Sequence, residues 1–250
     1  MPDASVFLIG GGWTAAAFPH TYGRFAAAAA AGTDGPPRIA CVLLDGEERD
    51  AYFARSAAAF AAVGIATVEP VFVSPERPLR PEDVAGANGI LVGGGLTPAY
   101  HEAIVPTADA WLPSLLERGV PYAGFSAGAA IAPARAIVGG WKLRRGGADL
   151  VVCAEETSED REQVDVRPGL GLVPFAVDVH ASQWGTATRL LHAVRAGLVP
   201  EGWAVDEDTM LEVGDNVVAV HGLGGAYRVR PAGDGLSVEI LHDGDRRNLA

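Results

Sequence analysis

Short runs of apolar residues, each the length of a β-strand, alternate along the chain with segments of helix length. This alternation is typical of an α/β fold whose central sheet is mostly parallel. We therefore expect a parallel sheet with helices on both faces. The expected strands are residues 6–9, 38–44, 66–73, 88–92, 120–124, 175–179 and 203–208, and the expected helices are residues 15–31, 48–63, 100–118, 127–132 and 186–196.

Glycines and prolines predict several of the boundaries. Gly32 and Gly64 follow two of the expected helices, where a glycine commonly ends a helix. Pro106 and Pro113 should interrupt the helical segment 100–118, because proline has no N–H to donate inside a helix.

Two regions depart from the alternation. Residues 139–174 are first glycine-rich and then acidic, which predicts an irregular insertion over the sheet edge or over a site. The C-terminal region predicts antiparallel strands with a hairpin around Gly233-Asp234-Gly235. The expected strands there are residues 217–220, 227–230 and 236–241. No repeat or linker divides the 250 residues, so we expect one domain, residues 1–250.

The charge balance limits the partners. The chain has 19 Lys and Arg against 31 Asp and Glu, a formal net charge of −12. Without a basic patch to neutralise phosphates, nucleic acids and anionic membranes are unfavourable partners. The N-terminal residues have no basic stretch and no long apolar core, so no signal peptide is expected. We predict a cytoplasmic protein. Its two cysteines, Cys41 and Cys153, should each be buried rather than joined in a disulfide.

The strongest chemical motif is Gly124-Phe125-Ser126-Ala127-Gly128, which joins an expected strand to an expected helix. A serine in such a tight turn is pushed out beyond the carboxyl end of the sheet. The helix N-terminus and the Ala127 N–H would then face an oxyanion that forms beside it. The motif is also compatible with a plain strand-to-helix turn, so it requires a general base as a second observation.

Two chain orders supply a base and an acid for Ser126. His180 ends the expected strand 175–179, so it should emerge at the same carboxyl edge of the sheet as Ser126. The acid candidates are Asp178 on the same strand and the cluster Asp206-Glu207-Asp208 after another strand, and this order uses Glu207. The other order, serine, acid and then histidine, would use His221 or His242 in the terminal β region. The pattern favours the first order, because it brings all three side chains to sheet edges.

Several motifs occur together and in one order, and the set resembles the peptidase E (aspartyl dipeptidase) and cyanophycinase family of serine peptidases. This family is related to class I glutamine amidotransferases. The motifs are Leu8-Ile9-Gly10-Gly11-Gly12, Leu91-Val92-Gly93-Gly94-Gly95-Leu96-Thr97, the serine motif, Val177-Asp178-Val179-His180 with Thr188-Arg189-Leu190 downstream, and Val205-Asp206-Glu207-Asp208-Thr209.

The resemblance implies a class I glutamine amidotransferase-like, flavodoxin-like α/β fold. It also implies a Ser-His-Glu triad of Ser126, His180 and Glu207. The oxyanion would lie on the Ala127 N–H and on a second N–H from Gly94 or Gly95.

A short peptide is the substrate that the resemblance implies. The side chains expected around it are Leu96, Thr97, Asp178, Gln183, Trp184 and Arg189. Family members often carry basic residues shortly after the histidine, whereas residues 181–186 contain none here. Arg189 or the basic residues within 142–145 are the candidates to replace them. Trp184 is either a pocket wall or a packed aromatic.

No cofactor and no metal are expected, because the chain has no dinucleotide, P-loop, Cys-x-x-Cys or His-Glu-x-x-His motif. Three functional hypotheses follow. The first is a serine peptidase for short peptides. The second is a non-catalytic relative that binds a small molecule or a partner. The third is an acyltransferase with the same triad. The sequence leaves a homodimer open.

Overall fold

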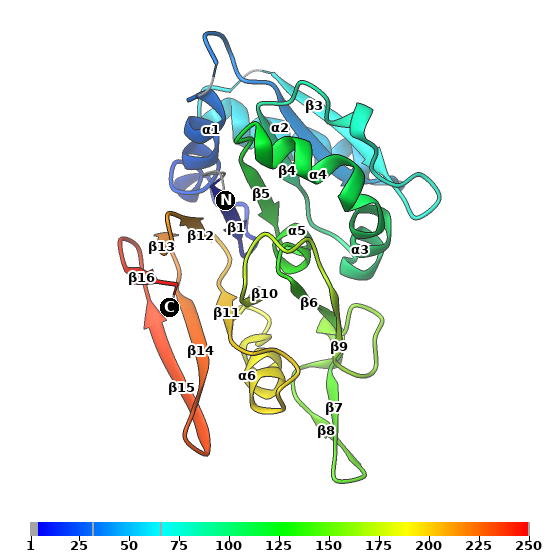
Figure 1. Cartoon of the computed structure of the whole chain (residues 1–250), viewed down its shortest axis with the longest axis vertical. Coiled ribbons are helices and arrows are strands. Elements are labelled where there is room, and N and C mark those ends of the chain that lie inside the picture. The colour runs from blue at the N-terminus through cyan, green and yellow to red at the C-terminus, as the bar shows by residue number, and fades with distance from the viewer. Residues whose placement is uncertain (1–4, 32, 66, 250) are drawn as a thin grey trace.

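The structure, a computed structural model, describes residues 5–31, 33–65 and 67–249. Its largest sheet has eight strands in the order β16-β13-β12-β1-β5-β4-β2-β3 (Figure 1). The five strands from β1 to β3 in that order are parallel, and β12, β13 and β16 extend the sheet antiparallel. The strands are β1 (Val6–Ile9), β2 (Ile39–Leu44), β3 (Val68–Val73), β4 (Gly89–Val92), β5 (Tyr122–Phe125), β12 (Thr209–Gly214), β13 (Val217–Gly222) and β16 (Arg246–Asn248).

Helices cover both faces of this sheet, as the alternation predicts. Phe7 and Ile9 of β1 point to one face and pack in a core cluster with residues of α1 and α2. Val6 and Leu8 point to the other face, toward α3, α4 and α5. Successive side chains of a strand face opposite ways, so both faces of β1 are buried. The helices are α1 (Tyr22–Ala30), α2 (Arg49–Ala62), α3 (Thr97–Ile104), α4 (Ala108–Glu117) and α5 (Ala127–Ile131).

A second sheet of four strands has the order β10-β11-β14-β15 and is covered on one face by α6 (Figure 1). We expected the strand before His180 to lie in the central sheet, and this expectation is wrong. The strand pairs in parallel with β11, not with any strand of the large sheet. The elements are β10 (Ala176–Val179), α6 (Ala187–Arg195), β11 (Gly202–Val205), β14 (Ala226–Ala232) and β15 (Gly235–Leu241).

The carboxyl ends of the parallel strands in the two sheets face each other. The N–H of His180, which follows β10, donates to the carbonyl of Gly10, which follows β1, at 3.0 Å. The Asp208 N–H donates to the Gly11 carbonyl at 2.8 Å, and the Gly10 N–H donates to the Thr209 carbonyl at 2.9 Å. Residues that follow strands of different sheets are therefore brought together.

The segment 139–174 is more regular than expected. β6 (Arg135–Gly139) pairs with β9 (Asp165–Pro168), and β7 (Lys142–Arg145) forms a hairpin with β8 (Ala148–Val151). The hairpin turn is Gly146-Gly147, and both glycines have positive φ, which a tight two-residue turn requires. The pattern did not reveal β7, β8 and β9 because none of them has the buried apolar run of a core strand. β6 does have such a run, Ala136-Ile137-Val138, and was missed.

Two helix predictions also need correction. The expected helix 15–31 is a 3₁₀ turn at Ala15–Ala17 followed by α1, with Pro19 in the break between them. The chain does leave the α-helix around Pro106, whereas Pro113 lies inside α4 without ending it. The predicted helix end at Gly32 and the predicted strand start at Ala66 lie outside the described residues.

The remaining expectations for the C-terminal region and the cysteines are confirmed. β14 and β15 form an antiparallel hairpin, with Ala232 opposite Gly235. Cys41 and Cys153 are buried and free. Burial raises the pKa of the Cys41 thiol to about 12. Within the described ranges, every helix is too short or too polar to cross a membrane.

Candidate active site

Ser126 lies in a strained turn between β5 and α5. Its φ is +52°, a value that non-glycine residues rarely adopt. The glycines on either side permit the turn, because a Cβ at Gly124 would overlap the backbone of Gly128, and a Cβ at Gly128 would overlap Val92. The Ser126 N–H donates to the Ile9 carbonyl at 2.9 Å, which ties the turn to β1. The turn thus has the sharp backbone geometry that the motif predicts.

The Ser126 hydroxyl contacts the histidine that the preferred chain order selects. Ser126 Oγ and His180 Nε2 are 2.8 Å apart, and both residues are buried. His180 also has a positive φ, +55°. Its ring stacks on Trp184 with the centroids 3.8 Å apart and the planes 9° apart. The imidazole is thus held between the hydroxyl and an aromatic face.

The other ring nitrogen of His180 contacts Glu207. His180 Nδ1 and Glu207 Oε1 are 2.8 Å apart, so a carboxylate orients the ring from the side opposite Ser126. The backbone N–H of Glu207 donates to Oε1 of Gln183 at 2.9 Å. Burial lowers the pKa of His180, and the hydrogen bond and charge of Glu207 partly oppose that shift. A lowered pKa favours the neutral imidazole, which is the form that can accept a proton.

The glycines after β1 allow the two sheets to approach. A Cβ at Gly11 would overlap the His180 ring, and one at Gly12 would overlap Asp208. Gly11 and Gly12 both have positive φ, +117° and +84°. Asp208 in turn accepts from the Thr14 N–H at 3.0 Å and from the Thr14 hydroxyl at 2.5 Å. The absence of side chains in Gly10-Gly11-Gly12 therefore allows His180 and Asp208 to approach this backbone closely.

Two N–H groups beside Ser126 are available to an oxyanion. Ala127 is the first residue of α5, so its N–H has no acceptor within the helix. Gly95 lines the same cavity as Ser126, and its N–H has no acceptor in the described ranges. Gly94 was the alternative donor to Gly95, and the structure favours Gly95. Its N–H already donates to the Tyr52 hydroxyl at 2.8 Å.

Two tyrosines, the partly buried Tyr52 and the buried Tyr100, hold the glycine turn in place. Tyr52 of α2 accepts from the Gly94 N–H, and the Tyr100 hydroxyl of α3 donates to the Gly94 carbonyl at 3.3 Å. Burial raises the pKa of both phenols, so both remain neutral hydrogen-bonding groups. The N–H and the carbonyl of Gly94 are thus both hydrogen-bonded, which orients the neighbouring Gly95.

A cavity of about 330 Å³ opens beside Ser126. Gly95 and Leu96 line it on one side, Trp184 lines another, and residues 156–160 complete it. Trp184 is 48% exposed even though its ring stacks on His180, so it is both a packed aromatic and a pocket wall. The segment 139–174 therefore lies over the site, which was one of its two predicted positions.

Asp178 and Arg189 were expected near the substrate, and the structure places them in a buried ion pair with each other. Arg189 donates to both carboxylate oxygens of Asp178, at 2.7 and 2.8 Å, and both side chains are buried. Arg189 also donates to the carbonyls of Gly140 and Thr157. This ion pair attaches α6 to the loops over the site. Its donors are used within the protein, so the pair does not line the cavity.

Thr97 and Gln183 have supporting contacts instead of the expected substrate contacts. Thr97 is buried, and its N–H donates to Oε2 of Glu159 at 2.9 Å. Gln183 accepts from the Glu207 N–H and does not line the cavity. Of the six expected substrate residues, only Leu96 and Trp184 line the cavity beside Ser126.

The alternative order, serine, acid and then histidine, does not agree with where His221 and His242 lie. His221 of β13 lies 3.2 Å from Glu212 of β12, at the antiparallel end of the large sheet. His242 follows β15 in the other sheet. Neither histidine contacts Ser126, whose hydroxyl is bonded to His180.

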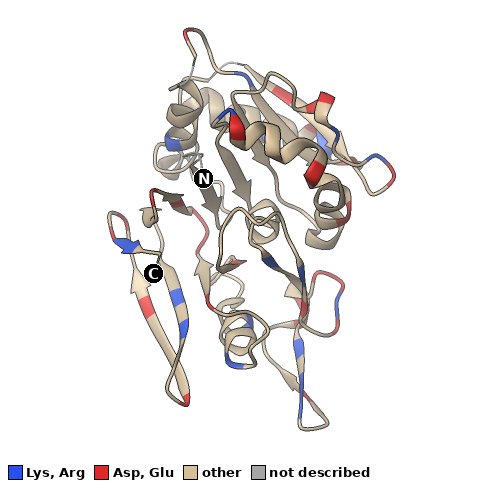
Figure 2. Ribbon diagram, viewed as in Figure 1, with Lys and Arg blue, Asp and Glu red and all other residues tan. Residues whose placement is uncertain are grey.

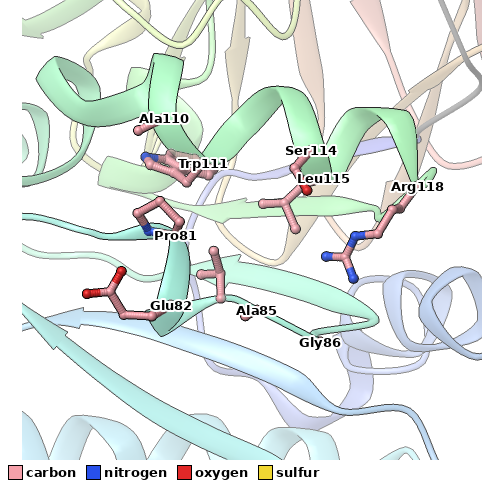
Figure 3. A pocket seen from close by; sticks show the side chains of 10 residues that line it. Pro81, Glu82, Ala85, Gly86, Ala110, Trp111, Ser114, Leu115 and Arg118 are labelled. Atoms are coloured by element: carbon pink, nitrogen blue, oxygen red, sulfur yellow. The ribbon is translucent and has the colours of Figure 1, made fainter.

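A larger cavity, of about 490 Å³, lies between α4 and the segment that precedes β4 (Figure 3). Its lining includes Trp111 and Leu115 from α4 and Pro81 and Glu82 from the opposite segment. It contains a serine, Ser114, but no histidine or cysteine. This cavity is larger than the one beside Ser126, whereas Ser126 and its partner His180 lie beside the smaller one.

Sequence reasoning did not find several residues of the site. Glu156, Glu159 and Asp160 line the cavity, and their acidic segment was the signal that could have located them. Tyr52 lies 42 residues before its partner Gly94, and no local motif marks it. Glu159 and Asp160 share a positive φ with Ser126 and His180, so strained backbone concentrates around this site.

Part of the chain matches a known peptidase family, and its fold matches a solved peptidase structure. Residues 39–139 match the model of peptidase family S51, a range that includes Ser126 and the Gly93-Gly94-Gly95 turn but not His180 or Glu207. A search of curated proteins found no matching sequence. The solved structure of a peptidase from an acI-B1 Actinobacterium has the same fold, with a TM-score of 0.64 and 16% identity over 99% of this chain and 97% of that chain. The match to peptidase family S51 confirms the resemblance to the peptidase E and cyanophycinase family, and with it the prediction of a peptidase-type hydrolase.

Proposed function

We propose that this protein hydrolyses short peptides as a serine peptidase, with Ser126 as nucleophile, His180 as general base and Glu207 as the residue that orients His180. One observation carries the proposal. Ser126 Oγ lies 2.8 Å from His180 Nε2, while His180 Nδ1 lies 2.8 Å from Glu207 Oε1. A hydroxyl, an imidazole and a carboxylate in this order are the elements of a serine hydrolase triad.

Acylation begins when Ser126 Oγ attacks the carbonyl carbon of the scissile peptide bond and His180 Nε2 takes the hydroxyl proton. The carbonyl oxygen becomes an oxyanion, which the N–H groups of Ala127 and Gly95 can stabilise. The tetrahedral intermediate then collapses. The C–N bond breaks, His180 gives its proton to the leaving amine, and an ester between the substrate and Ser126 remains.

Deacylation repeats these steps with water. His180 takes a proton from water, the hydroxide attacks the ester carbon, and the C–O bond to Ser126 breaks as His180 returns the proton to Oγ. Glu207 holds the Nδ1–H tautomer throughout and stabilises the imidazolium that forms in each half-reaction. An amine in place of water would give acyl transfer from the same intermediate.

The direct test is labelling of Ser126 with a fluorophosphonate probe, together with hydrolysis of a panel of dipeptides. We expect labelling at Ser126, found by mass spectrometry of the digested protein, and release of amino acids from the panel. Ser126→Ala should abolish labelling and lower turnover by about 10⁴-fold or more, with the melting temperature retained. Ser114→Ala is a matched control, since Ser114 lies in the larger cavity without a histidine and should leave both readouts unchanged.

A folded wild-type protein that neither labels nor hydrolyses the panel would instead support a non-catalytic relative. Labelling without hydrolysis, but with transfer of the acyl group to an added amine, would support the acyltransferase. A cytoplasmic location, a single domain and a homodimer remain predictions of the sequence.

A further inference from the structure

The cavity beside Ser126 differs from the rest of the site in its charge. Three of its lining side chains, Glu156, Glu159 and Asp160, are carboxylates, and its lining includes no lysine or arginine. We propose that this cavity selects a substrate with a positively charged nitrogen next to the scissile bond. The inference rests on the proposed peptidase function and names the substrate class for that same site.

The carboxylates are significant because of where they lie. They line the cavity that also contains the Ser126 hydroxyl, so a substrate whose carbonyl is within reach of Ser126 extends past them. All three belong to the loop between β8 and β9, where acidic residues predominate (Figure 2). Glu159 and Asp160 both have positive φ, +55° and +57°, so the loop holds them in a defined turn at the cavity wall.

Glu159 is the carboxylate most closely integrated with the site. Its Oε2 accepts from the Thr97 N–H at 2.9 Å, at the start of α3 directly after the Gly95 and Leu96 wall. Burial raises the pKa of Glu159, and the hydrogen bonds from Thr97 partly oppose the shift. A largely desolvated carboxylate gains more from a cationic partner than an exposed one does.

The nearby cations are already paired elsewhere. Arg189 is buried and bound to both oxygens of Asp178, and its other donors contact two backbone carbonyls. Lys142 forms an ion pair with Glu162 at 2.8 Å and lies over the Trp141 ring. Neither side chain lines the cavity, so neither can bind the acidic side chain of a substrate there. The local charge therefore disfavours an aspartyl or glutamyl side chain and favours a cation.

Two parts of a short peptide could provide that cation. One is the ammonium or guanidinium of a lysyl or arginyl side chain, and the other is the free α-amino group of a dipeptide. Both are hydrogen-bond donors with a positive charge, and both fit a wall of carboxylates that accept hydrogen bonds.

The experiment compares kcat/KM across a matched set of dipeptides whose first residue is lysine, arginine, norleucine or aspartate, each with a free or an acetylated α-amino group. Norleucine has the chain of lysine without the charge. If a side chain binds, lysine and arginine should exceed norleucine by about 10-fold, and aspartate should be the poorest substrate. If the α-amino group binds, acetylation should cost about 10-fold for every side chain except aspartate, whose rate is low in both forms.

Variants then assign the effect to the carboxylates. Glu159→Gln keeps an oxygen for the Thr97 N–H and removes the charge, and Glu156→Gln with Asp160→Asn alters only exposed side chains. Both should lower kcat/KM for the cationic substrates by about 10-fold more than for N-acetyl-norleucine substrates, which have no positive charge. Glu155→Gln is the matched control, because Glu155 is exposed on the same loop but lies outside the cavity.

Aspartyl or norleucyl substrates cleaved as fast as lysyl ones, with no effect of acetylation, would overturn the inference provided that Ser126 still labels with the fluorophosphonate. That outcome leaves the peptidase function intact. Absence of both labelling and hydrolysis would overturn the proposed function, and the substrate class with it.

Discussion

The candidate site is assembled from two sheets that contribute in different ways. The eight-stranded sheet provides Ser126 and the two N–H donors, Ala127 and Gly95, from turns at the ends of β5 and β4. The four-stranded sheet provides His180 and Glu207 from the ends of β10 and β11. Both halves contain a residue with positive φ, Ser126 in the first and His180 in the second, but only the second half adds a carboxylate, Glu207, that bonds the proposed base.

This difference indicates which substitutions should impair catalysis. The nucleophile half lies within one sheet, because the turn around Ser126 is held by its flanking glycines and by the neighbouring strands β1 and β4. The base half works only if the second sheet docks against Gly10-Gly11-Gly12, where the backbone hydrogen bonds between the sheets converge. Changes at the junction should therefore impair catalysis without touching the nucleophile.

The largest effect should come from Glu207→Gln, which removes the charge that orients His180. We expect kcat/KM to fall by about 10³- to 10⁴-fold, since an amide would favour the wrong imidazole tautomer. The pH profile gives a sharper readout. Burial already lowers the pKa of His180 below its usual 6.5, so the acid limb of wild-type kcat/KM should lie below pH 6.5.

Glu207 raises the pKa of His180 against the effect of burial. The acid limb of the residual Glu207→Gln activity should therefore move to still lower pH, because the imidazolium loses its partner. A limb that moves upward, or does not move, would contradict the assignment of Glu207 as the partner of His180. Gln183→Ala, which removes a contact to the Glu207 N–H but no charge, is the control for position alone.

A smaller loss is expected from Gly11→Ala at the junction of the sheets. The new Cβ would overlap the His180 ring, and φ at this position is +117°. Displacement of the base by about 1 Å should lower kcat by about 100-fold. Fluorophosphonate labelling should slow in parallel, because the displaced base activates Ser126 less well.

Gly64→Ala is the matched control for Gly11→Ala. Gly64 also has a positive φ, +88°, but a Cβ there meets open space. It should lower the melting temperature without a change in kcat. Equal activity losses in the two variants would mean that backbone strain, rather than contact with His180, explains the effect.

A still smaller effect is expected from Tyr52→Phe on the nucleophile side. The variant removes the acceptor of the Gly94 N–H and so loosens the turn that orients Gly95. We expect kcat to fall by about 10-fold with KM nearly unchanged, because the turn acts mainly on the oxyanion. A change in KM alone would assign Tyr52 to substrate binding.

The smallest effect on activity, and the largest on stability, should come from Arg189→Met. This change leaves Asp178 buried without its partner, at a cost of about 3–5 kcal/mol in the free energy of unfolding. At a temperature where the variant is folded, KM for short peptides should stay within about 2-fold of wild type. A large rise in KM with unchanged stability would return Arg189 to the substrate site.

The accuracy of the sequence predictions depends on how local each feature is. The five parallel strands were predicted within a few residues, because buried strands of an α/β fold are nearly continuous apolar runs. The hairpin β7–β8 was missed, since its short and largely exposed strands lack the buried apolar run of a core strand. The ion pair of Asp178 and Arg189 was not predicted, because spacing cannot distinguish a buried ion pair from two ligand contacts.

The sequence by itself determined the α/β class, the serine turn and the order of Ser126, His180 and Glu207, since these depend on neighbouring residues and on the chain direction. Only the tertiary structure decided that the base and the acid come from a second sheet, that Tyr52 occupies the Gly94 N–H, and that the cavity is acidic. These features arise from contacts between residues far apart in the chain, and the pattern of neighbouring residues does not specify which distant segments pack together.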